Sequence, residues 1–218
     1  MSSKLLSSLC RANISILSQK VALIDALTIN HGADKARVVF RSACPLIGAS
    51  IGQHYRHSMD HIELAALVAS TGTAEGINAN NSENISTPPL HYDLRVRGGT
   101  LEHDMDESRK RILSVMDIFQ DLELKQQTEE SNVITNCPVV AHFYLSPSED
   151  EKGGGSQEIG LTSTIGRELG FCAHHAIHHM AMVKIIALNF AGLSVDELPP
   201  DFGKAPSTII YDRGNTSN

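Results

Sequence analysis

The sequence predicts an all-α fold, a four-helix bundle with a small β-hairpin between its third and fourth helices. Apolar residues recur every three or four positions in four separate segments, which is the period of a helix with one buried face. Residues 138–145 depart from that period and are rich in Val, Phe and Tyr. With 218 residues and 41% hydrophobic content, the chain is long enough for one compact core. We therefore expect a single domain over residues 1–218.

The first helix is expected over residues 3–29. Asn30 and Gly32 provide a stop signal. The residues expected on its buried face are Leu5, Leu9, Ala12, Ile16, Leu23 and Leu27. The first 24 residues also contain Lys4, Arg11 and Lys20, many serines and no acid, which is the composition of an organelle transit peptide. We favour the core helix, because removing it would leave the bundle one helix short.

The remaining elements follow in order along the chain. A second helix is expected over residues 45–70, followed by a long polar loop over 71–90. The third helix begins at Thr100, a suitable N-cap, with Glu102 and Asp104 in its first turn. A hairpin over residues 138–163 has a turn rich in Pro, Asp, Glu and Gly. The fourth helix precedes a proline-containing tail, residues 192–218, expected to be extended across the bundle.

The second helix places histidines on its buried face. The face expected to be buried contains Ile47, Ser50, His54, His57, His61, Leu64 and Val68. A buried imidazole needs a partner for each ring nitrogen. Histidines packed against one another and a metal site both satisfy that need, and we favour the metal site because a second helix shows the same pattern.

The other helix with this pattern is the fourth predicted helix. It carries His174, His175, His178 and His179 in six residues. At about 100° per residue, His175 and His179 fall on the apolar face, whereas His174 points away from it. Two imidazoles at positions i and i+4 lie one turn apart and can share one metal ion. The competing pair, His174 and His178, is disfavoured because His174 would face solvent.

Composition excludes several classes of protein. The formal charge of −7 argues against binding nucleic acid through phosphate neutralisation. The four cysteines form no CxxC pair, which suits free thiols in a reducing compartment. No run approaches the roughly 18 uninterrupted apolar residues of a membrane span. We therefore expect a soluble, cytoplasmic protein.

Four separated motifs resemble those of the DinB-like superfamily, and the resemblance extends from about residue 47 onward. They are GQHYRHSMDH at 52–61, HYDLRVRG at 91–98, GRELGF at 166–171 followed by His175, His178 and His179, and DFGKAPST at 201–208. The resemblance implies an up-down-down-up bundle, often dimeric. It also implies a divalent metal bound by one histidine of the second helix and an HxxxH pair of the fourth. The matching residues are His57, His175 and His179. The helical pattern alone does not choose among His54, His57 and His61, so His57 rests on the resemblance.

Three neutral imidazoles leave coordination positions open, which is typical of catalytic rather than structural sites. Zinc and nickel are the first candidates, since imidazole suits both. We expect a metal-dependent enzyme acting on a small molecule, with transfer of a low-molecular-weight thiol ahead of hydrolysis. A non-catalytic metal-binding bundle and an interaction module whose histidines pair only with one another stay open, as does a homodimer.

The segment before the third helix is a second possible contributor. An arginine, Arg95 or Arg97, is expected to bind a substrate carboxylate through both guanidinium nitrogens. Asp93 is expected to orient a metal-binding histidine. The alternative is an ion-paired loop that fixes the start of the helix.

Overall fold

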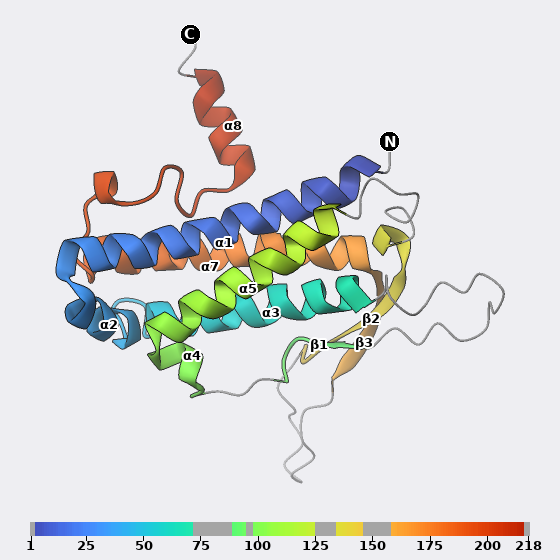
Figure 1. Cartoon of the computed structure of the whole chain (residues 1–218), viewed down its shortest axis with the longest axis horizontal. Coiled ribbons are helices and arrows are strands. Elements are labelled where there is room, and N and C mark those ends of the chain that lie inside the picture. Colours follow the sequence, from blue (N-terminus) through green and yellow to red (C-terminus); the bar gives the residue numbers. More distant parts are fainter. Residues whose placement is uncertain (1–2, 72–88, 95–97, 125–133, 146–157, 216–218) are drawn as a thin grey trace, which may run out of the picture.

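The computed structural model describes residues 3–71, 89–94, 98–124, 134–145 and 158–215. The chain is mainly helical with a small three-stranded sheet at one end (Figure 1). This confirms the coarser part of the expected fold class, a mainly helical chain with a small β element. Four long helices dominate the described part: α1 (Ser3–His31), α3 (Ile51–Thr71), α5 (Met105–Leu124) and α7 (Ile165–Asn189).

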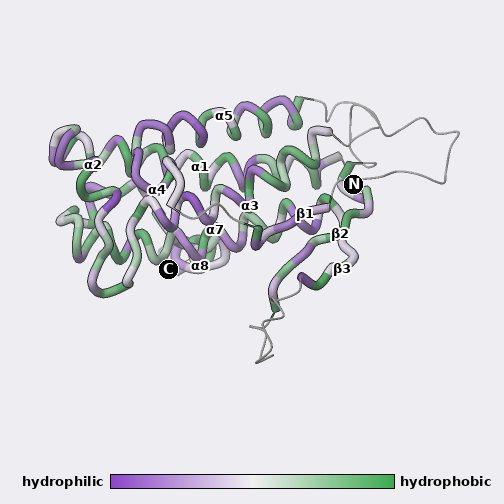
Figure 2. The backbone as a smooth tube through the Cα atoms, turned by 90° about the horizontal axis from the view of Figure 1, so that it is seen from below, coloured by the Kyte–Doolittle hydropathy of each residue, from purple (hydrophilic) through white to green (hydrophobic). Residues whose placement is uncertain are grey.

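The long helices pack in a closed arrangement. Both α1 and α3 contact α5 and α7. In Figure 1, α1 and α7 run away from the end where the sheet lies, while α3 and α5 run towards that end. Figure 2 shows hydrophobic and hydrophilic stretches alternating along the helices, so each has an apolar side to bury. Fully buried side chains from all four helices include Leu17, Ile62, Phe119 and Val183.

The buried face of α1 differs from the predicted one. Leu5 and Ala12 are exposed, whereas Lys20 is fully buried. The other buried residues of the first half of α1 include Leu6, Cys10, Asn13 and Leu17. Asn13 is tolerated there because its Nδ2 donates to the backbone oxygens of Leu9 and Leu169. An apolar pattern alone could not predict this face, since three of its members, Ser7, Asn13 and Lys20, are polar.

Two predicted helix starts are corrected. The second long helix begins at Ile51 rather than residue 45, and a separate helix α2 (Ala33–Arg41) precedes it. Gly48 adopts a positive φ of 75°, and a bridge between Cys44 and Ala49 closes a turn there, so no helix continues through it. The third predicted helix is divided into α4 (Thr100–His103) and α5.

Asp104 causes that division. Its backbone is extended, with φ −110° and ψ 104°. Its carboxylate accepts hydrogen bonds from the backbone amides of Asp106 and Glu107. Asp104 therefore caps α5, which is the usual role of an aspartate before the first turn. Thr100 begins only the four-residue α4.

The predicted hairpin strands form and pair. Strands β2 (Pro138–Phe143) and β3 (Ile159–Thr164) are antiparallel. A further strand, β1 (Leu90–His91), pairs in parallel with β2 and was not predicted. The predicted turn at residues 146–156 lies outside the described residues, as does most of the predicted 71–90 loop. The parallel pair brings the segment that follows β1 beside the helices.

The prediction of a wholly extended tail is wrong. After a short 3-10 helix (Val195–Glu197), residues Pro206–Asn215 form helix α8, which points away from the four long helices in Figure 1. Proline is well tolerated in the first turn of a helix, so Pro206 starts α8 rather than preventing it. Phe202 is buried, and the amide of Gly203 donates to Gln19 Oε1, so the chain before α8 is held against α1.

One helix in the described part, Lys4–His31, is long and apolar enough to cross a membrane by length and composition alone. It packs against α5 and α7, and its inward side chains belong to the buried core. Core helices of soluble proteins commonly meet the same criteria. The structure is therefore consistent with a soluble protein.

Candidate metal centre

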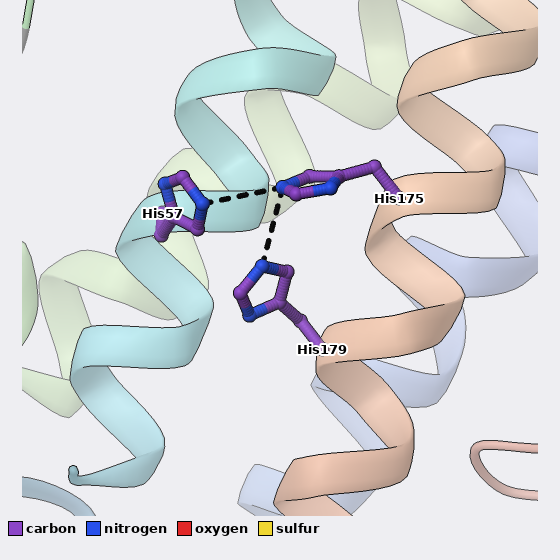
Figure 3. Close-up of side chains that lie close together, drawn as sticks. All are labelled: His57, His175 and His179. Atoms are coloured by element: carbon purple, nitrogen blue, oxygen red, sulfur yellow. Dashed lines mark hydrogen bonds between the residues drawn. The ribbon is translucent and has the colours of Figure 1, made fainter. Parts of the chain in front are cut away.

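Three histidines from two helices meet at one point between α3 and α7. Figure 3 shows His57 on α3 facing His175 and His179 on α7. The Nε2 atom of His175 lies 3.2 Å from His57 Nε2 and 3.2 Å from His179 Nε2. All three side chains are half-buried, and their ligand atoms lie within 4.8 Å of one another. The structure thus brings together the three residues that the sequence analysis selected.

This arrangement fits a bound transition metal. Four ligands at about 2.0–2.1 Å around zinc place neighbouring nitrogens about 3.3 Å apart in a tetrahedron. The two separations of 3.2 Å are close to that edge length. Within the described residues, this group contains no carboxylate or cysteine. The protein therefore offers three neutral nitrogen donors and leaves further positions for water or substrate.

One imidazole of the centre, that of His179, resists protonation. Burial, together with the neighbouring His57 and His175, lowers the pKa of His179 to about 2. Burial also lowers the pKa of His54, with Lys20 and His178 contributing. A neutral imidazole has a free lone pair, which is the form that binds a metal. At neutral pH, His179 is therefore ready to act as a ligand.

Two more histidines of α3, His54 and His61, lie beside the three histidines of the centre. The Nδ1 atoms of His54 and His179 lie 2.9 Å apart, so the two rings share a hydrogen bond on the side of His179 away from the centre. His61 is buried, and its ring lies 4.5 Å from that of His175. All three candidates of the second predicted helix therefore reach the cluster. Only His57 joins the group of three.

Aromatic rings enclose one side of the cluster. Tyr92 stacks on His61, with ring centroids 4.7 Å apart and planes at 12°. Phe171 stacks on His175 at 5.7 Å, and Phe143 of β2 packs against both Tyr92 and Phe171. Burial raises the pKa of Tyr92 far above its usual range, so its hydroxyl stays protonated. Tyr92, Phe143 and Phe171 therefore form an aromatic wall on this side of the cluster.

A buried lysine lies beneath the cluster. Lys20 of α1 is fully buried, and its Nζ donates to Ser58 Oγ at 2.6 Å and lies 4.2 Å from the centre of the Tyr55 ring. Burial lowers the pKa of Lys20 to about 7. A pKa near 7 leaves Lys20 only partly protonated at neutral pH, so it repels a divalent cation less than an ordinary lysine would. The burial of Lys20 was not predicted, because lysine is rarely found at core positions.

The structure describes only some of the other predicted site residues. His174 is exposed, as the helical pattern predicted, and so is His178. The carboxylate of Asp93 accepts a hydrogen bond from the backbone amide of Tyr144, just beyond the end of β2. Arg95 and Arg97 lie outside the described residues. A role for these three in binding substrate stays a prediction.

A cavity of about 570 Å³ lies on the other side of the Tyr92 wall. It is lined by α3, the start of α4 and the segment around β1, including His91 and Tyr92. Its arginines are already paired: Arg111 with Asp60 and Glu63, and Arg56 with Asp60. Tyr92 lines this cavity and also stacks on His61, so it connects the cavity wall to the histidine cluster.

Comparisons with known proteins give one partial similarity. The chain is 33% identical over 122 residues to a protein of Rhizopus delemar named FK506-binding protein 5. The match covers 56% of this chain and 27% of that protein. No family model matches the chain. No solved structure matches it either. Because the match covers 27% of the relative, the name of that protein does not indicate what the matched segment does.

Proposed function

We propose that this protein is a divalent-metal-dependent enzyme of the DinB-like superfamily that transfers a thiol to or from a small molecule. The observation that carries the proposal is the convergence of His57, His175 and His179, with His175 Nε2 lying 3.2 Å from the Nε2 atom of each of the other two. The motifs that resemble the superfamily provide the same three residues. The directions of α1, α3, α5 and α7 support the up-down-down-up four-helix bundle that the resemblance implies.

The chemistry follows from the donor set. A zinc or nickel ion at this site would lower the pKa of a coordinated thiol or water and so supply a nucleophile at neutral pH. Burial and the neighbouring histidines keep His179 neutral, as its low pKa indicates. His54 fixes the orientation of His179 through its Nδ1 contact, and Tyr92 and Phe171 shield the ligands from water.

A metal-dependent hydrolase is the second candidate, because the same open positions accept water as well as a thiolate. The proposal also assigns Arg95 or Arg97 to the substrate carboxylate and Asp93 to the orientation of the site. We propose a cytoplasmic protein with a small-molecule partner and without nucleic acid or membrane partners. A homodimer is compatible with the proposal.

The test starts with tag-free protein. Elemental analysis and calorimetric titration should find a divalent metal bound through the three histidines. A screen of low-molecular-weight thiols with electrophilic acceptors, with and without chelator, should then reveal activity that chelation removes and metal restores. Release of product from ester or amide substrates without thiol consumption would favour the hydrolase. Metal binding with no turnover of any substrate would support a non-catalytic metal-binding protein.

A further inference from the structure

A second group of metal-binding side chains lies on the sheet, apart from the helices' histidines. It consists of His91 on β1, His142 on β2 and Glu158, the residue before β3. His91 Nδ1 lies 2.6 Å from Glu158 Oε2, and the rings of His91 and His142 stack with centroids 4.4 Å apart. One ligand atom from each residue lies within 4.8 Å of the other two.

The strand register places these three side chains on one face. His142 pairs with His91 on the parallel strand β1 and with Gly160 on the antiparallel strand β3. Paired residues on neighbouring strands point to the same face of a sheet. Glu158 lies two residues before Gly160 and therefore shares that face. The buried pair Leu90 and Ala141 lies on the opposite face.

Gly160 leaves the space that the cluster needs. A Cβ atom at this position would lie 3.1 Å from His142 Cε1 and 3.0 Å from Val140 Cγ1. Both separations are tighter than ordinary contacts, so any larger residue would push the His142 ring out of place. The glycine thus allows the imidazole to lie flat across β3, beside His91.

We propose that these three residues form a second binding site, which takes a divalent transition metal such as zinc. Two imidazoles and one carboxylate form a common set of three protein ligands for zinc, with a position left for water. The carboxylate atom Glu158 Oε1 is buried and has no hydrogen-bond partner in the described part of the chain. A buried carboxylate oxygen without a partner is unfavourable, and a cation would compensate it.

A cation bound at this site would link three strands of the sheet. β1 contains two residues and pairs with β2 through two positions, so its own backbone pairing is weak. A metal bound to His91, His142 and Glu158 would join β1, β2 and the start of β3. Tyr92 follows His91 directly and stacks on His61. Occupancy of the sheet site would therefore stabilise the aromatic wall of the helical cluster, although the proposal does not depend on a metal in that cluster.

The alternative is a plain hydrogen bond between His91 and Glu158 that links β1 to β3 without any ion. The two explanations differ in stoichiometry. A variant with both His175→Ala and His179→Ala removes two ligands of the helical cluster and leaves the sheet unchanged. We expect metal-free protein of this variant to bind about one equivalent of zinc in calorimetric titration, and the unmodified protein about two. Added zinc should also raise the melting temperature of the variant.

Glu158→Gln in the same double variant is the sharper test, because it keeps the shape of the side chain and removes its charge. We expect zinc affinity to fall at least about tenfold. His103→Ala, which removes an exposed histidine on α4, is the matched control and should leave zinc binding unchanged. Circular dichroism should show that each variant is folded.

The outcomes separate this proposal from the proposed function. Fewer than about 0.1 equivalents of zinc in the His175/His179 double variant, with one equivalent in the unmodified protein, would overturn the sheet site and leave the helical centre intact. One equivalent in both proteins, lost on Glu158→Gln, would support the sheet site and contradict the helical centre. Zinc bound by the double variant but unaffected by Glu158→Gln would also overturn the sheet site as defined here.

Discussion

The helical and sheet clusters use histidine in different electrostatic settings. The helical cluster (His57, His175 and His179) has nitrogen donors only, and two long helices hold it. The sheet cluster (His91, His142 and Glu158) has its own carboxylate, and short strands hold it. Glu158 pairs with His91 inside the sheet cluster, so that cluster offers a negative charge to a cation, whereas the helical cluster offers imidazole nitrogens. Binding of a cation at the helical cluster therefore depends on the number and placement of those nitrogens.

The largest expected effect tests the helical cluster directly. His175→Ala or His179→Ala removes one of the three convergent nitrogens. We expect affinity for zinc at this cluster to fall by more than about 1,000-fold, because two ligands cannot enclose the ion. Competition with a chelator of known affinity measures the change. Unaltered affinity in both variants would show that the helical cluster is only a packed group of histidines.

A smaller loss is expected at His54. Its Nδ1 contacts His179 Nδ1, on the ring atom opposite the nitrogen that faces His175. Partners that orient a metal-binding histidine are worth about 10–100-fold in metal affinity, so His54→Ala should weaken binding by that amount. His54→Gln keeps a hydrogen-bonding group and should recover part of the loss. A loss as large as that of His179→Ala would mean that His54 is itself a ligand.

Lys20 tests the surroundings of the helical cluster rather than its ligands. The folded pKa of about 7 lies below the unfolded value near 10.5. Between these values the unfolded chain holds more protons, so the free energy of unfolding should rise with pH from about 7 to about 10. Lys20→Met should remove that rise and stabilise the protein at pH 7 by about 1–4 kcal/mol, as buried charges replaced by apolar residues often do. Urea unfolding at pH 7 and pH 9 measures both effects.

Lys20→Arg is the matched comparison for that variant. An arginine keeps its charge throughout this pH range and should destabilise the buried position strongly. A stability profile of Lys20→Met that rises with pH as steeply as that of the unmodified protein would contradict a neutral buried lysine.

The two clusters also differ in how far the sequence alone reveals them. Helical spacing is local, so residues three and four apart share a face regardless of the remaining chain. This is why the burial of the HxxxH pair and the exposure of His174 could be predicted. The choice of His57 required the family resemblance, because His54 and His61 satisfy the same spacing.

The sheet cluster depends on pairing between distant segments. β1 and β2 are about 50 residues apart in the chain, and no local pattern in two residues indicates a strand or its partner. The same limit applies to Lys20, whose burial depends on Ser58 of another helix. The prediction of an extended tail is wrong for a different reason. Proline can interrupt a helix, but it is also favoured in the first turn, where Pro206 lies in α8.

The smallest expected effect is the most specific test of the helical register. His174 neighbours His175 in the chain but is exposed, while His175 faces His57 and His179. His174→Ala should therefore change metal affinity by less than about twofold, because exposed substitutions away from a site rarely have larger effects. The comparison removes the same chemical group from adjacent positions of one helix, so differences in helix propensity or histidine content cancel. Equal losses at His174 and His175 would show that the helix presents the other pair, His174 and His178, to the metal, and the cluster between α3 and α7 would then lose its assigned role.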